Sequence, residues 1–421
     1  MTTSAPVYAT ILMHRRLSNL KSGSGVHLMY LCSILFDAGY QVRIVAAPTT
    51  SFGHIPFCRP DRVLCDNDIP VIWPGSLKVG RLYISTRSRV WRKFILRALA
   101  SVTSLTKGLN GGRRLSFPSA LGKTLTDREA EEVQRAANAL GADLVIAEYS
   151  SLAPLLGGCN AKKRGVLMHD LFSSRAVSFQ ESGICPDHNP ITLDQEVARL
   201  RDAHVCIHAS QIEADAVKHH LPDAEHIWMR PRLTKNTGDS SAPPRVVFIG
   251  VKHGGNRAAL DMILKEIWPR VWQETGVELW IVGEISKWVE GRHDGVRCVG
   301  FVEDLRTLGD GNTIGIAPML VTSGISIKIG TYLELGMRVV TFKKTLEAYS
   351  DMLDGLVTAV DTPEEFTETL IDMLKKSEAQ RGCPQDAVQR LEPEMSNEEL
   401  LEALRCRQVS SSKQQVARHD D

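Results

Sequence analysis

The stretch from Gly300 to Phe342 limits most strongly how this chain can fold. It runs as a loop, a helix, a buried apolar strand, a glycine-containing loop, a second helix and a second buried strand. Strands that alternate with helices in this way are typical of a mostly parallel sheet covered by helices. The stretch therefore predicts an α/β fold of the doubly wound kind.

The turn Thr322–Gly324 within this stretch has the chemistry of a phosphate site. We expect it to open a helix whose first turns carry Ser326 and Lys328. A helix N-terminus offers unpaired N–H groups and partial positive charge, and a glycine lets a ligand approach the backbone closely. Because Lys328 adds a full charge, a diphosphate-bearing substrate is the first candidate ligand.

Length and composition limit the remaining possibilities. The chain has 421 residues, which favours two domains of about 150–200 residues each. It has no apolar run near the ~20 residues that span a bilayer. Its first residues lack the order of a secretory signal, so we expect a cytoplasmic protein. The nine cysteines show no metal-binding spacing, and we expect reduced thiols and no metal site.

Charge is distributed unevenly along the chain. The net charge is +1, yet residues 69–126 hold eleven Lys and Arg residues and no Asp or Glu. Apolar residues between Trp91 and Leu99 have a spacing compatible with a basic amphipathic helix. Residues 78–114 could thus lie on an anionic membrane surface at the inner face of a membrane. A solvated basic face and a basic mouth for an anionic substrate are the alternatives, whereas no module predicts nucleic-acid binding.

The N-terminal part begins as a βαβ unit. Val7–Met13 predicts a buried strand, Ser22–Gly25 a loop, Val26–Ala38 a helix and Val42–Ala46 the next parallel strand. Further strands and helices alternate after it. Predicted strands are 143–147, 165–168 and 204–208, and predicted helices are 127–140 and 193–202.

A second alternating series follows a polar, Gly- and Pro-containing linker. Its predicted strands are 245–249, 278–282, 295–299, 313–317, 338–341 and 356–360, and its last helix is 363–376. The predicted domains are 1–233 and 245–376, joined by the linker 234–244 and followed by a polar tail, 377–421, with one helix at 397–405. Two such domains create a cleft at the carboxyl ends of their strands.

The order of motifs in the second series resembles the C-terminal domain of the retaining GT-B glycosyltransferases, family four. The motifs are Arg245–Gly250, Glu278–Gly283, Gly300–Leu305, Ile316–Pro318, Gly336–Val340 and Asp361–Phe366. Gly23–Gly25 followed by a helix and by Gly39–Val42 resembles the opening of the acceptor domain. The resemblance implies two Rossmann-like domains that face each other across a cleft.

The same resemblance implies a nucleotide diphosphate sugar held mainly by the C-terminal domain. Lys328 stands where a basic residue of the family meets the diphosphate, and Gly324 and Ser326 of the same helix-opening turn are donor-binding candidates beside it. The loop after the first strand of this domain adds Lys252 and the amides of Gly254 and Gly255 as candidates. Surface lysines without a ligand are the alternative. The fold class needs no metal and no cofactor besides the donor substrate, and no DxD motif ends a strand.

One departure from the family pattern concerns the ribose end of the donor. Many members carry two glutamates eight positions apart, and Ser323 and Thr331 stand there instead. Neither accepts hydrogen bonds as strongly as a carboxylate. Glu334 lies three residues after Thr331 on the same helix face, so it is a donor-binding candidate, with a surface charge as the alternative.

For catalysis, the resemblance implies a histidine at a strand end of the N-terminal domain, near the sugar. His169 matches best, and a structural histidine paired to Asp170 is the alternative. Lys328 would stabilise the departing diphosphate. Gly23, Ser24 and Gly25 are candidates for the phosphate or acceptor, and His27 for the acceptor.

These observations favour a retaining, metal-independent glycosyltransferase of polysaccharide biosynthesis. It would transfer a sugar from a nucleotide diphosphate sugar to a glycan or a lipid-linked cell-envelope acceptor. Two alternatives stay open: a catalytically silent protein of this fold that binds a glycan or a partner glycosyltransferase, and a sugar-nucleotide epimerase of the same fold.

Overall fold

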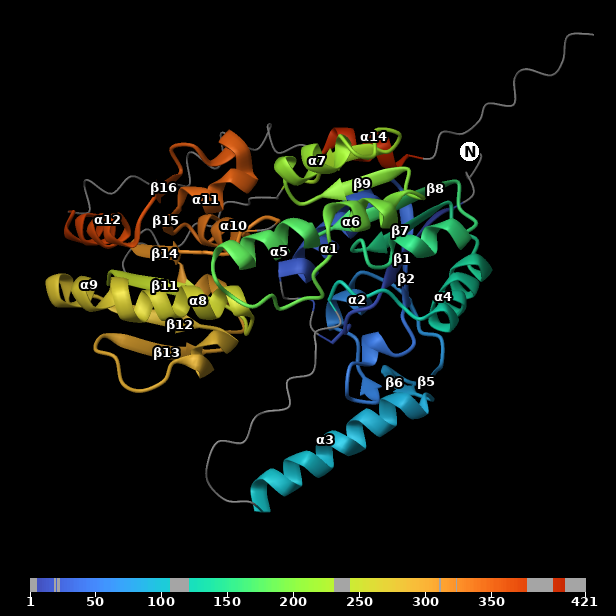
Figure 1. The fold of residues 1–421 in the computed structure, drawn as a ribbon, viewed down its shortest axis with the longest axis horizontal. Helices are drawn as coiled ribbons and strands as arrows, with labels where there is room; N and C mark the ends of the chain where they lie inside the picture. The colour runs from blue at the N-terminus through green and yellow to red at the C-terminus, as the bar shows by residue number, and fades with distance from the viewer. Residues whose placement is uncertain are drawn as a thin grey trace, which may run out of the picture.

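The computed structural model describes most of the chain as two α/β domains (Figure 1). The described residues are 6–18, 20, 23–106, 121–230, 243–309, 312–322, 324–376 and 397–405. Ser22, Ser323, residues 107–114 of the predicted basic segment, most of the predicted linker, and residues 377–396 and 406–421 of the predicted tail lie outside these residues.

The N-terminal domain is built on a parallel sheet of seven strands in the order β10-β9-β8-β7-β1-β2-β4. Its strands are β1 Val7–Met13, β2 Tyr40–Ala46, β4 Val71–Ile72, β7 Leu144–Glu148, β8 Lys163–Met168, β9 Val205–His208 and β10 Glu225–Trp228. The helices around it are α1 Gly23–Asp37, α2 Arg62–Asp66, α4 Asp127–Ala139, α5 Phe172–Glu181, α6 Leu193–Leu200 and α7 Gln211–Lys218. The central strands are buried on both faces by separate apolar clusters, which explains their nearly unbroken apolar sequences.

The C-terminal domain contains a parallel sheet of six strands in the order β13-β12-β11-β14-β15-β16. These strands are β11 Arg245–Ile249, β12 Glu278–Val282, β13 Val296–Gly300, β14 Thr313–Ala317, β15 Arg338–Phe342 and β16 Val357–Val360. Its α-helices are α8 Gly254–Met262, α9 Trp268–Thr275, α10 Ile327–Glu334, α11 Lys343–Leu346 and α12 Pro363–Lys375. The predicted α/β class, with two doubly wound domains, is confirmed.

Tyr332 fixes α10 against the sheet of the C-terminal domain. This side chain is fully buried. Its hydroxyl accepts a hydrogen bond from the backbone N–H of Ile249 at 2.9 Å and donates one to the carbonyl of Ile316 at 3.1 Å. A Cβ on Gly315 would lie 2.3 Å from the Tyr332 ring, so only glycine leaves room for it. The helix that carries Lys328 is thereby held on the central strands β11 and β14.

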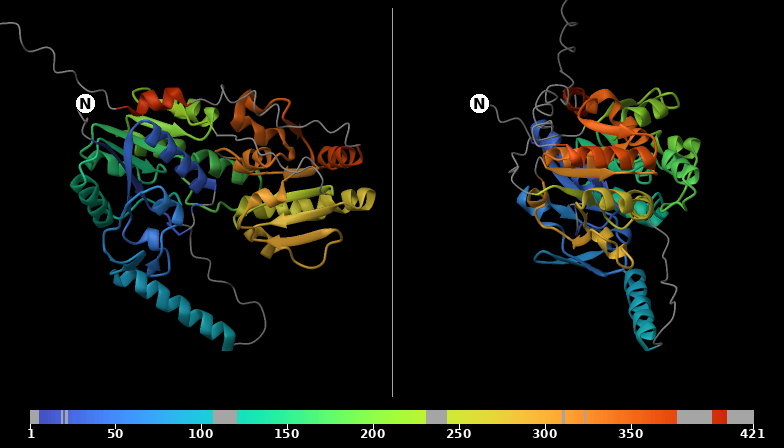
Figure 2. Two further views of the ribbon diagram at one scale, coloured as in Figure 1. Left: turned by 180° about the vertical axis from the view of Figure 1, so that it is seen from behind. Right: turned by 90° about the vertical axis from the view of Figure 1, so that its left-hand side faces the viewer.

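Along the chain between β2 and α4, the structure forms a small antiparallel sheet that the sequence did not predict. It consists of β3 Phe57–Cys58, β6 Leu82–Ser85 and β5 Ser76–Val79 in this spatial order. The helix α3, Ser88–Thr106, follows it and projects away from the rest of the domain (Figures 1 and 2). None of the described helices is both long and apolar enough to cross a bilayer.

The predicted starts of two helices were wrong. Gly23 to Gly25 form the first turn of α1 and not a loop, and Gly25 packs so closely that a Cβ would meet the Leu20 carbonyl oxygen at 2.2 Å. The helix after the Thr322–Gly324 turn begins only at Ile327, with Ser326 as its N-cap residue. Lys328 is consequently the second residue of α10.

Candidate functional site

Hydrogen bonds from two backbone N–H groups to side chains join the two domains beside the start of α10. The N–H of Gly324 donates to Glu213 Oε1 of α7 at 2.8 Å. Nearby, the N–H of Thr322 donates to Ser178 Oγ of α5 at 2.9 Å. The loop between β14 and α10 is therefore held directly against the N-terminal domain.

Gly324 occupies a position that other residues fit poorly. Its φ is 58°, in the left-handed region. A Cβ here would lie 2.3 Å from the backbone oxygen of His169 and 2.7 Å from Asp170 Oδ1. The glycine therefore brings the loop of the C-terminal domain into close contact with the end of β8.

Lys328 and Asn256 connect the N-termini of α10 and α8. The Lys328 ammonium donates to Asn256 Oδ1 at 2.6 Å and lies 5.9 Å from the centre of the Phe248 ring. Burial lowers the pKa of Lys328 to about 8, so the lysine is protonated at neutral pH. Its contacts among the described residues include no carboxylate, which leaves its positive charge available to an anion.

The turn that opens α8 is ordered by its own side chains. His253 is the N-cap residue, and its Nδ1 accepts from the N–H of Asn256 at 3.4 Å. Asn256 donates in turn to the carbonyl of Val251 at 2.8 Å. Burial, Lys328 and Arg175 lower the pKa of His253 to about 3, which keeps this ring neutral and able to accept.

The other residues of this loop that were predicted to bind the donor substrate differ in exposure. Lys252 is exposed, and its ammonium lies 5.7 Å from the centre of the Trp288 ring. Gly255 is buried beneath His253, whereas Gly254 faces the N-terminal domain, where a Cβ would lie 3.2 Å from Phe179. The structure thus brings Gly254 and Gly255 close to Lys328 and places Lys252 at the outer edge.

An ion-pair cluster of the N-terminal domain faces these helix ends. Arg175 of α5 donates to both carboxylate oxygens of Asp187 at 3.0 Å and to Asp170 Oδ2 at 3.3 Å. Asp187 Oδ2 also lies 4.0 Å from His253 Nδ1. Arg175 is thereby shared between two carboxylates, and the cluster reaches from the end of β8 to α8.

A buried hydrogen-bonded chain runs behind this cluster. Nδ1 of His27 lies 3.0 Å from Nδ1 of His169, and Nε2 of His169 lies 3.0 Å from Glu148 Oε1. The chain continues through Arg15, whose Nε is 2.9 Å from the same Glu148 oxygen and whose guanidinium donates to Ser24 Oγ at 2.8 Å. The structure therefore connects three predicted residues, Ser24, His27 and His169.

The protonation states of these hydrogen-bonded side chains follow from their contacts. Burial alone would raise the pKa of Glu148, but Arg15, His169 and His14 outweigh it and leave this pKa below its usual value. An ionised Glu148 only accepts, so Nε2 of His169 carries a proton.

The remaining nitrogens of the histidine pair can then be assigned. Burial and His169 lower the pKa of His27 far below its usual value. When both rings are neutral, His27 donates its Nδ1 proton to Nδ1 of His169. Nε2 of His27 then keeps a lone pair that has no partner among the described residues. Both ring nitrogens of His169 are occupied, and this residue meets the Gly324 loop through its backbone carbonyl.

The predicted ribose-end residues lie further along α10. Thr331 and Glu334 are both half-buried. The carbonyl of Ser326, at the N-cap, accepts from the hydroxyl of Tyr349 at 2.7 Å, and the Ser326 side chain caps no N–H. Gly23, at the start of α1, faces this helix across the domain boundary, since a Cβ there would lie 3.0 Å from Ile327 Cδ1.

Two buried glutamates hold the start of α5 in place through hydrogen bonds from backbone N–H groups. Glu196 accepts from the N–H groups of Phe172 and Ser173 at 3.0 and 2.8 Å, which caps the N-terminus of α5. Glu213 accepts from the N–H of Leu171 at 3.1 Å as well as from Gly324. Burial, helped by nearby carboxylates, raises the pKa of Glu213 to about 7.

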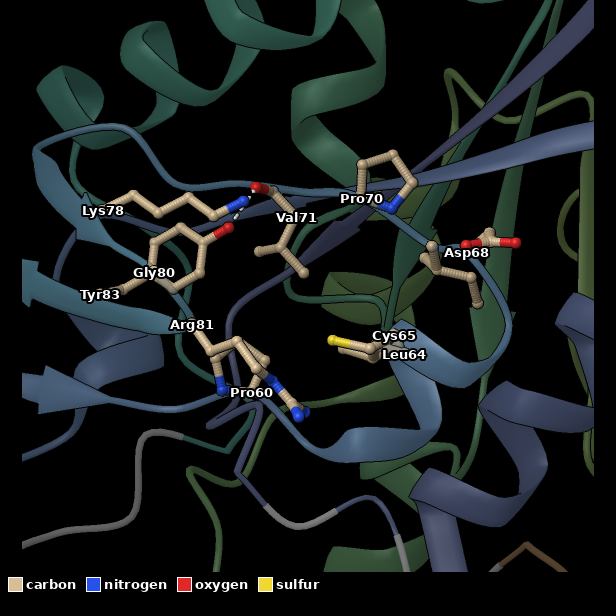
Figure 3. A pocket seen from close by; sticks show the side chains of 11 residues that line it. Pro60, Leu64, Cys65, Asp68, Pro70, Val71, Lys78, Gly80, Arg81 and Tyr83 are labelled. Atoms are coloured by element: carbon tan, nitrogen blue, oxygen red, sulfur yellow. Dashed lines mark hydrogen bonds between the residues drawn. The ribbon is translucent and has the colours of Figure 1, made fainter.

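A separate hollow of about 420 Å³ lies entirely within the N-terminal domain. Figure 3 shows its lining, where the Tyr83 hydroxyl donates to the Val71 carbonyl at 2.8 Å. Lys78 and Arg81 of the acid-free segment border it, together with Asp68. None of the predicted donor or catalytic residues lines this hollow.

Sequence reasoning missed several residues of the domain boundary. They are Arg15, Glu148, Arg175, Asp187, Glu213 and Asn256. For some a signal was present, because Glu148 ends a buried strand and Arg15 follows one by two residues, where ligands of parallel sheets bind. Glu213 gave no such signal, since it is one acidic residue in a helix with several polar ones.

Known proteins match this chain in two ways. The family model described as Glycosyl transferases group 1 matches residues 243–376. No curated protein matches the chain. The matched residues cover the C-terminal domain, including α8 and α10, so the resemblance of its motifs to those of glycosyltransferases is confirmed there.

Solved glycosyltransferase structures match over nearly the whole chain. Sucrose-phosphate synthase from Thermosynechococcus elongatus has a TM-score of 0.60 at 11% identity, over 94% of this chain and 96% of that chain. Anabaena HepE in complex with UDP and glucose has a TM-score of 0.59 at 14% identity, over 94% and 99%. A mutant of S. aureus TarM in complex with Fondaparinux, alpha-GlcNAc-glycerol and UDP has a TM-score of 0.61 at 11% identity, over 94% and 98%. At these identities the likeness is one of fold, and the fold is GT-B.

Proposed function

We propose that this GT-B chain, whose residues 243–376 match the group 1 glycosyl transferases, transfers a sugar from a nucleotide diphosphate sugar. The observation that carries the proposal is the meeting of two helix N-termini at the Lys328–Asn256 hydrogen bond. Two helix N-termini and one lysine without a carboxylate partner among the described residues suit a diphosphate. Two structures that resemble this chain contain UDP, one together with glucose and one together with Fondaparinux and alpha-GlcNAc-glycerol.

In this proposal Lys328 and the α8 and α10 amides stabilise the diphosphate as it departs. Gly254, Gly255 and Ser326 would contact the diphosphate. Gly324, whose N–H is bonded to Glu213, would serve the donor by holding the loop before α10 in place. The lowered pKa of Lys328, about 8, still leaves the ammonium charged at neutral pH, and burial strengthens its interaction with an anion. Lys252 would contact the donor from the exposed edge.

His169 would contribute to the sugar site through the position of its backbone carbonyl. Its ring is held between Glu148 and His27, and its carbonyl meets the Gly324 loop. We propose that this carbonyl faces the donor sugar and that the Nε2 lone pair of His27 serves the acceptor, with Gly23, Ser24 and Gly25 beside it. At the ribose end, Thr331 and Glu334 would share the contact that a carboxylate makes elsewhere in the family.

The stereochemistry and the metal requirement are part of the proposal. We expect retention of the anomeric configuration, which NMR of the product decides directly. Because Lys328 and the helix termini supply the positive charge, transfer should proceed equally well with and without added Mg²⁺ or Mn²⁺. The acceptor class that we propose is a glycan or a lipid-linked cell-envelope molecule.

A melting and turnover panel tests the proposal. The full chain is incubated with UDP-, GDP- and dTDP-sugars, and the melting temperature, donor hydrolysis and sugar transfer are measured. A donor at 100 times its dissociation constant should stabilise the fold by about 2.7 kcal/mol. Lys328→Ala should abolish this stabilisation, whereas Lys265→Ala, which removes an exposed lysine of the same domain, should leave it unchanged.

Different outcomes separate the competing functions. A silent GT-B protein would show no stabilisation by any donor, and Thr331 in place of a glutamate is the observation that favours it. An epimerase would convert the donor without an acceptor and form no glycoside. Donor-dependent stabilisation with neither hydrolysis nor transfer would contradict the catalytic part of the proposal alone.

We further propose that α3 places the enzyme on an anionic membrane surface. This helix exposes Ile95, Leu96 and Leu99, with 52, 58 and 57% of each residue accessible. Exposed basic residues accompany them on the same helix; these are Arg89, Arg92 and Lys93. A helix with apolar and basic residues can bury its apolar side at the headgroup boundary while Lys and Arg meet anionic lipids.

Vesicle sedimentation tests this placement. The wild-type chain should bind vesicles that contain phosphatidylserine, bind less at high salt, and not bind purely zwitterionic vesicles. Leu96→Asp and Leu99→Asp should each weaken binding, whereas Phe301→Asp, at an exposed apolar residue of the C-terminal domain, should not. Binding that is indifferent to lipid charge and salt would rule out the electrostatic part.

A further inference from the structure

Three metal-ligating side chains converge at the edge of the N-terminal sheet. They are Cys206 and His208 of β9 and His226 of β10, and their ligand atoms all lie within 4.8 Å of one another. Cys206 and His208 are two residues apart on a strand, so they share one face of the sheet. The parallel register places His226 directly opposite Cys206. The strand pairing itself therefore assembles the group.

The geometry between the two imidazoles matches that of metal ligands. Nε2 of His208 lies 3.1 Å from Nδ1 of His226. Two nitrogens bound to one tetrahedral zinc ion at their usual bond lengths are separated by about 3.3 Å. Only a small movement of either ring would thus place both nitrogens around one ion.

His226 is already oriented as a ligand. Its Nε2 lies 2.8 Å from the carbonyl oxygen of Leu221 and can only donate to it. The proton is therefore on Nε2, and the lone pair of Nδ1 points towards His208. Metal-bound histidines commonly donate their other ring N–H to a carbonyl in this way.

His208 can make its Nε2 lone pair available at little cost. In the metal-free chain this nitrogen donates its proton to His226 Nδ1, while Nδ1 of His208 has no partner among the described residues. Transfer of the proton to Nδ1 thus breaks no bond except the one that a metal replaces. Cys206 and His208 are fully buried and His226 is half-buried, so water can complete the coordination from the side of His226.

We propose that Cys206, His208 and His226 form a structural Zn²⁺ site that fastens the edge strand β10 to β9. A thiolate with two imidazoles is a ligand set that suits zinc. Binding releases the Cys206 thiol proton to solvent. The site belongs to the sheet edge and supplies no group to the donor site proposed at Lys328, so it does not depend on the proposed glycosyl transfer.

Metal analysis and cobalt spectroscopy test the site on the full chain. After dialysis against Zn²⁺ and removal of free metal, wild-type protein should retain one zinc per chain and melt at a higher temperature than the metal-free form. Co²⁺ in place of zinc should give the thiolate charge-transfer band and the intense visible bands of tetrahedral coordination. Cys206→Ser should lose the charge-transfer band, and His226→Ala should lose tight binding.

Cys159→Ser provides the matched control, because Cys159 is another buried thiol of the same domain. This variant should bind zinc and cobalt as the wild type does. Circular dichroism and the melting temperature of each metal-free variant show whether it folds. Zinc retained at equal stoichiometry by Cys206→Ser and His226→Ala would overturn the site, as would a wild-type chain that retains none.

Discussion

At the scale of single residues, Glu213 is the clearest case of a side chain whose environment decides its behaviour. It is buried, belongs to the N-terminal domain, and accepts a hydrogen bond from Gly324 of the C-terminal domain. Burial raises its pKa from 4.5 to about 7. The folded state therefore binds a proton between these values that the unfolded state has released.

The stability of the fold should accordingly depend on pH through Glu213. The contribution is fully present below about pH 4.5 and is lost as the pH rises through about 7. A pKa difference of one corresponds to about 1.4 kcal/mol, so the loss should be on the order of 3 kcal/mol. Urea unfolding at pH 5, 6, 7 and 8 measures it.

Glu213→Gln is the variant that isolates this effect. Glutamine keeps an oxygen that can accept from Gly324 and Leu171 but has no proton to lose in this pH range. The difference in unfolding free energy between wild type and variant should change across this pH range in the direction given above. A difference that stays constant from pH 5 to 8 would show that Glu213 does not titrate there.

At the residue level, backbone chemistry alone singled out part of the region around α10. Gly324 and Lys328 could be found because a glycine turn before a helix is a recognisable phosphate feature. The role of Asn256 could not be predicted from its loop motif, because it arises from a hydrogen bond to Lys328, 72 positions away. The ion pairs of Arg175 could not be predicted either. Asp170 and Asp187 lie only 5 and 12 positions away, but they stand in the loops on either side of α5, whose conformation the sequence does not specify.

At the scale of elements, the turn before α10 is where the two domains meet. Gly324→Ala should be far more damaging than an equivalent change elsewhere. Both the left-handed φ and the contacts with His169 and Asp170 oppose a Cβ. The conformation alone costs about 1–2 kcal/mol, and the clash should also displace the loop and abolish donor-induced stabilisation.

Gly276→Ala separates these two effects. Gly276 ends α9 with a φ of 63°, and a Cβ there would meet no atom within 4 Å. This variant should lose stability through the conformation alone and bind donor like the wild type. Equal donor binding by the two variants, measured by the melting shift, would mean that the Gly324 contact is dispensable.

Elements themselves were largely predictable from the sequence, for a physical reason. Strands such as Val7–Met13, Glu278–Val282 and Thr313–Ala317 are found within their predicted bounds, because buried parallel strands are apolar throughout. The antiparallel strands β3, β5 and β6 were missed, since they are short and half exposed. The start of α1 was missed because its first turn contains glycines, which are usually signs of a loop.

At the scale of the whole molecule, the C-terminal helix α14, Glu398–Leu404, returns to the N-terminal domain. Leu400 and Leu404 are fully buried in its core cluster, and the Tyr40 hydroxyl donates to the Leu404 carbonyl at 2.6 Å. The sequence predicted this helix, but its docking site could not be predicted, because a short amphipathic pattern does not specify its partner.

Removal of either leucine side chain should destabilise the N-terminal domain. Leu404→Ala or Leu400→Ala should cost about 2–5 kcal/mol, because each leaves a cavity between α14 and the sheet. Glu402→Ala, on the exposed side of the same helix, is the control and should have little effect. Denaturant unfolding and limited proteolysis measure the difference, and equal unfolding midpoints would show that α14 contributes no core.

The return of α14 also has a mechanical consequence. The chain leaves the N-terminal domain after Arg230 and comes back at Asn397, whose side chain accepts from the Arg230 N–H at 3.1 Å and donates to the Arg230 carbonyl at 3.4 Å. The residue at which the chain leaves this domain and the residue at which it returns are thus bonded directly to each other. A change at Asn397 would therefore loosen both ends at once.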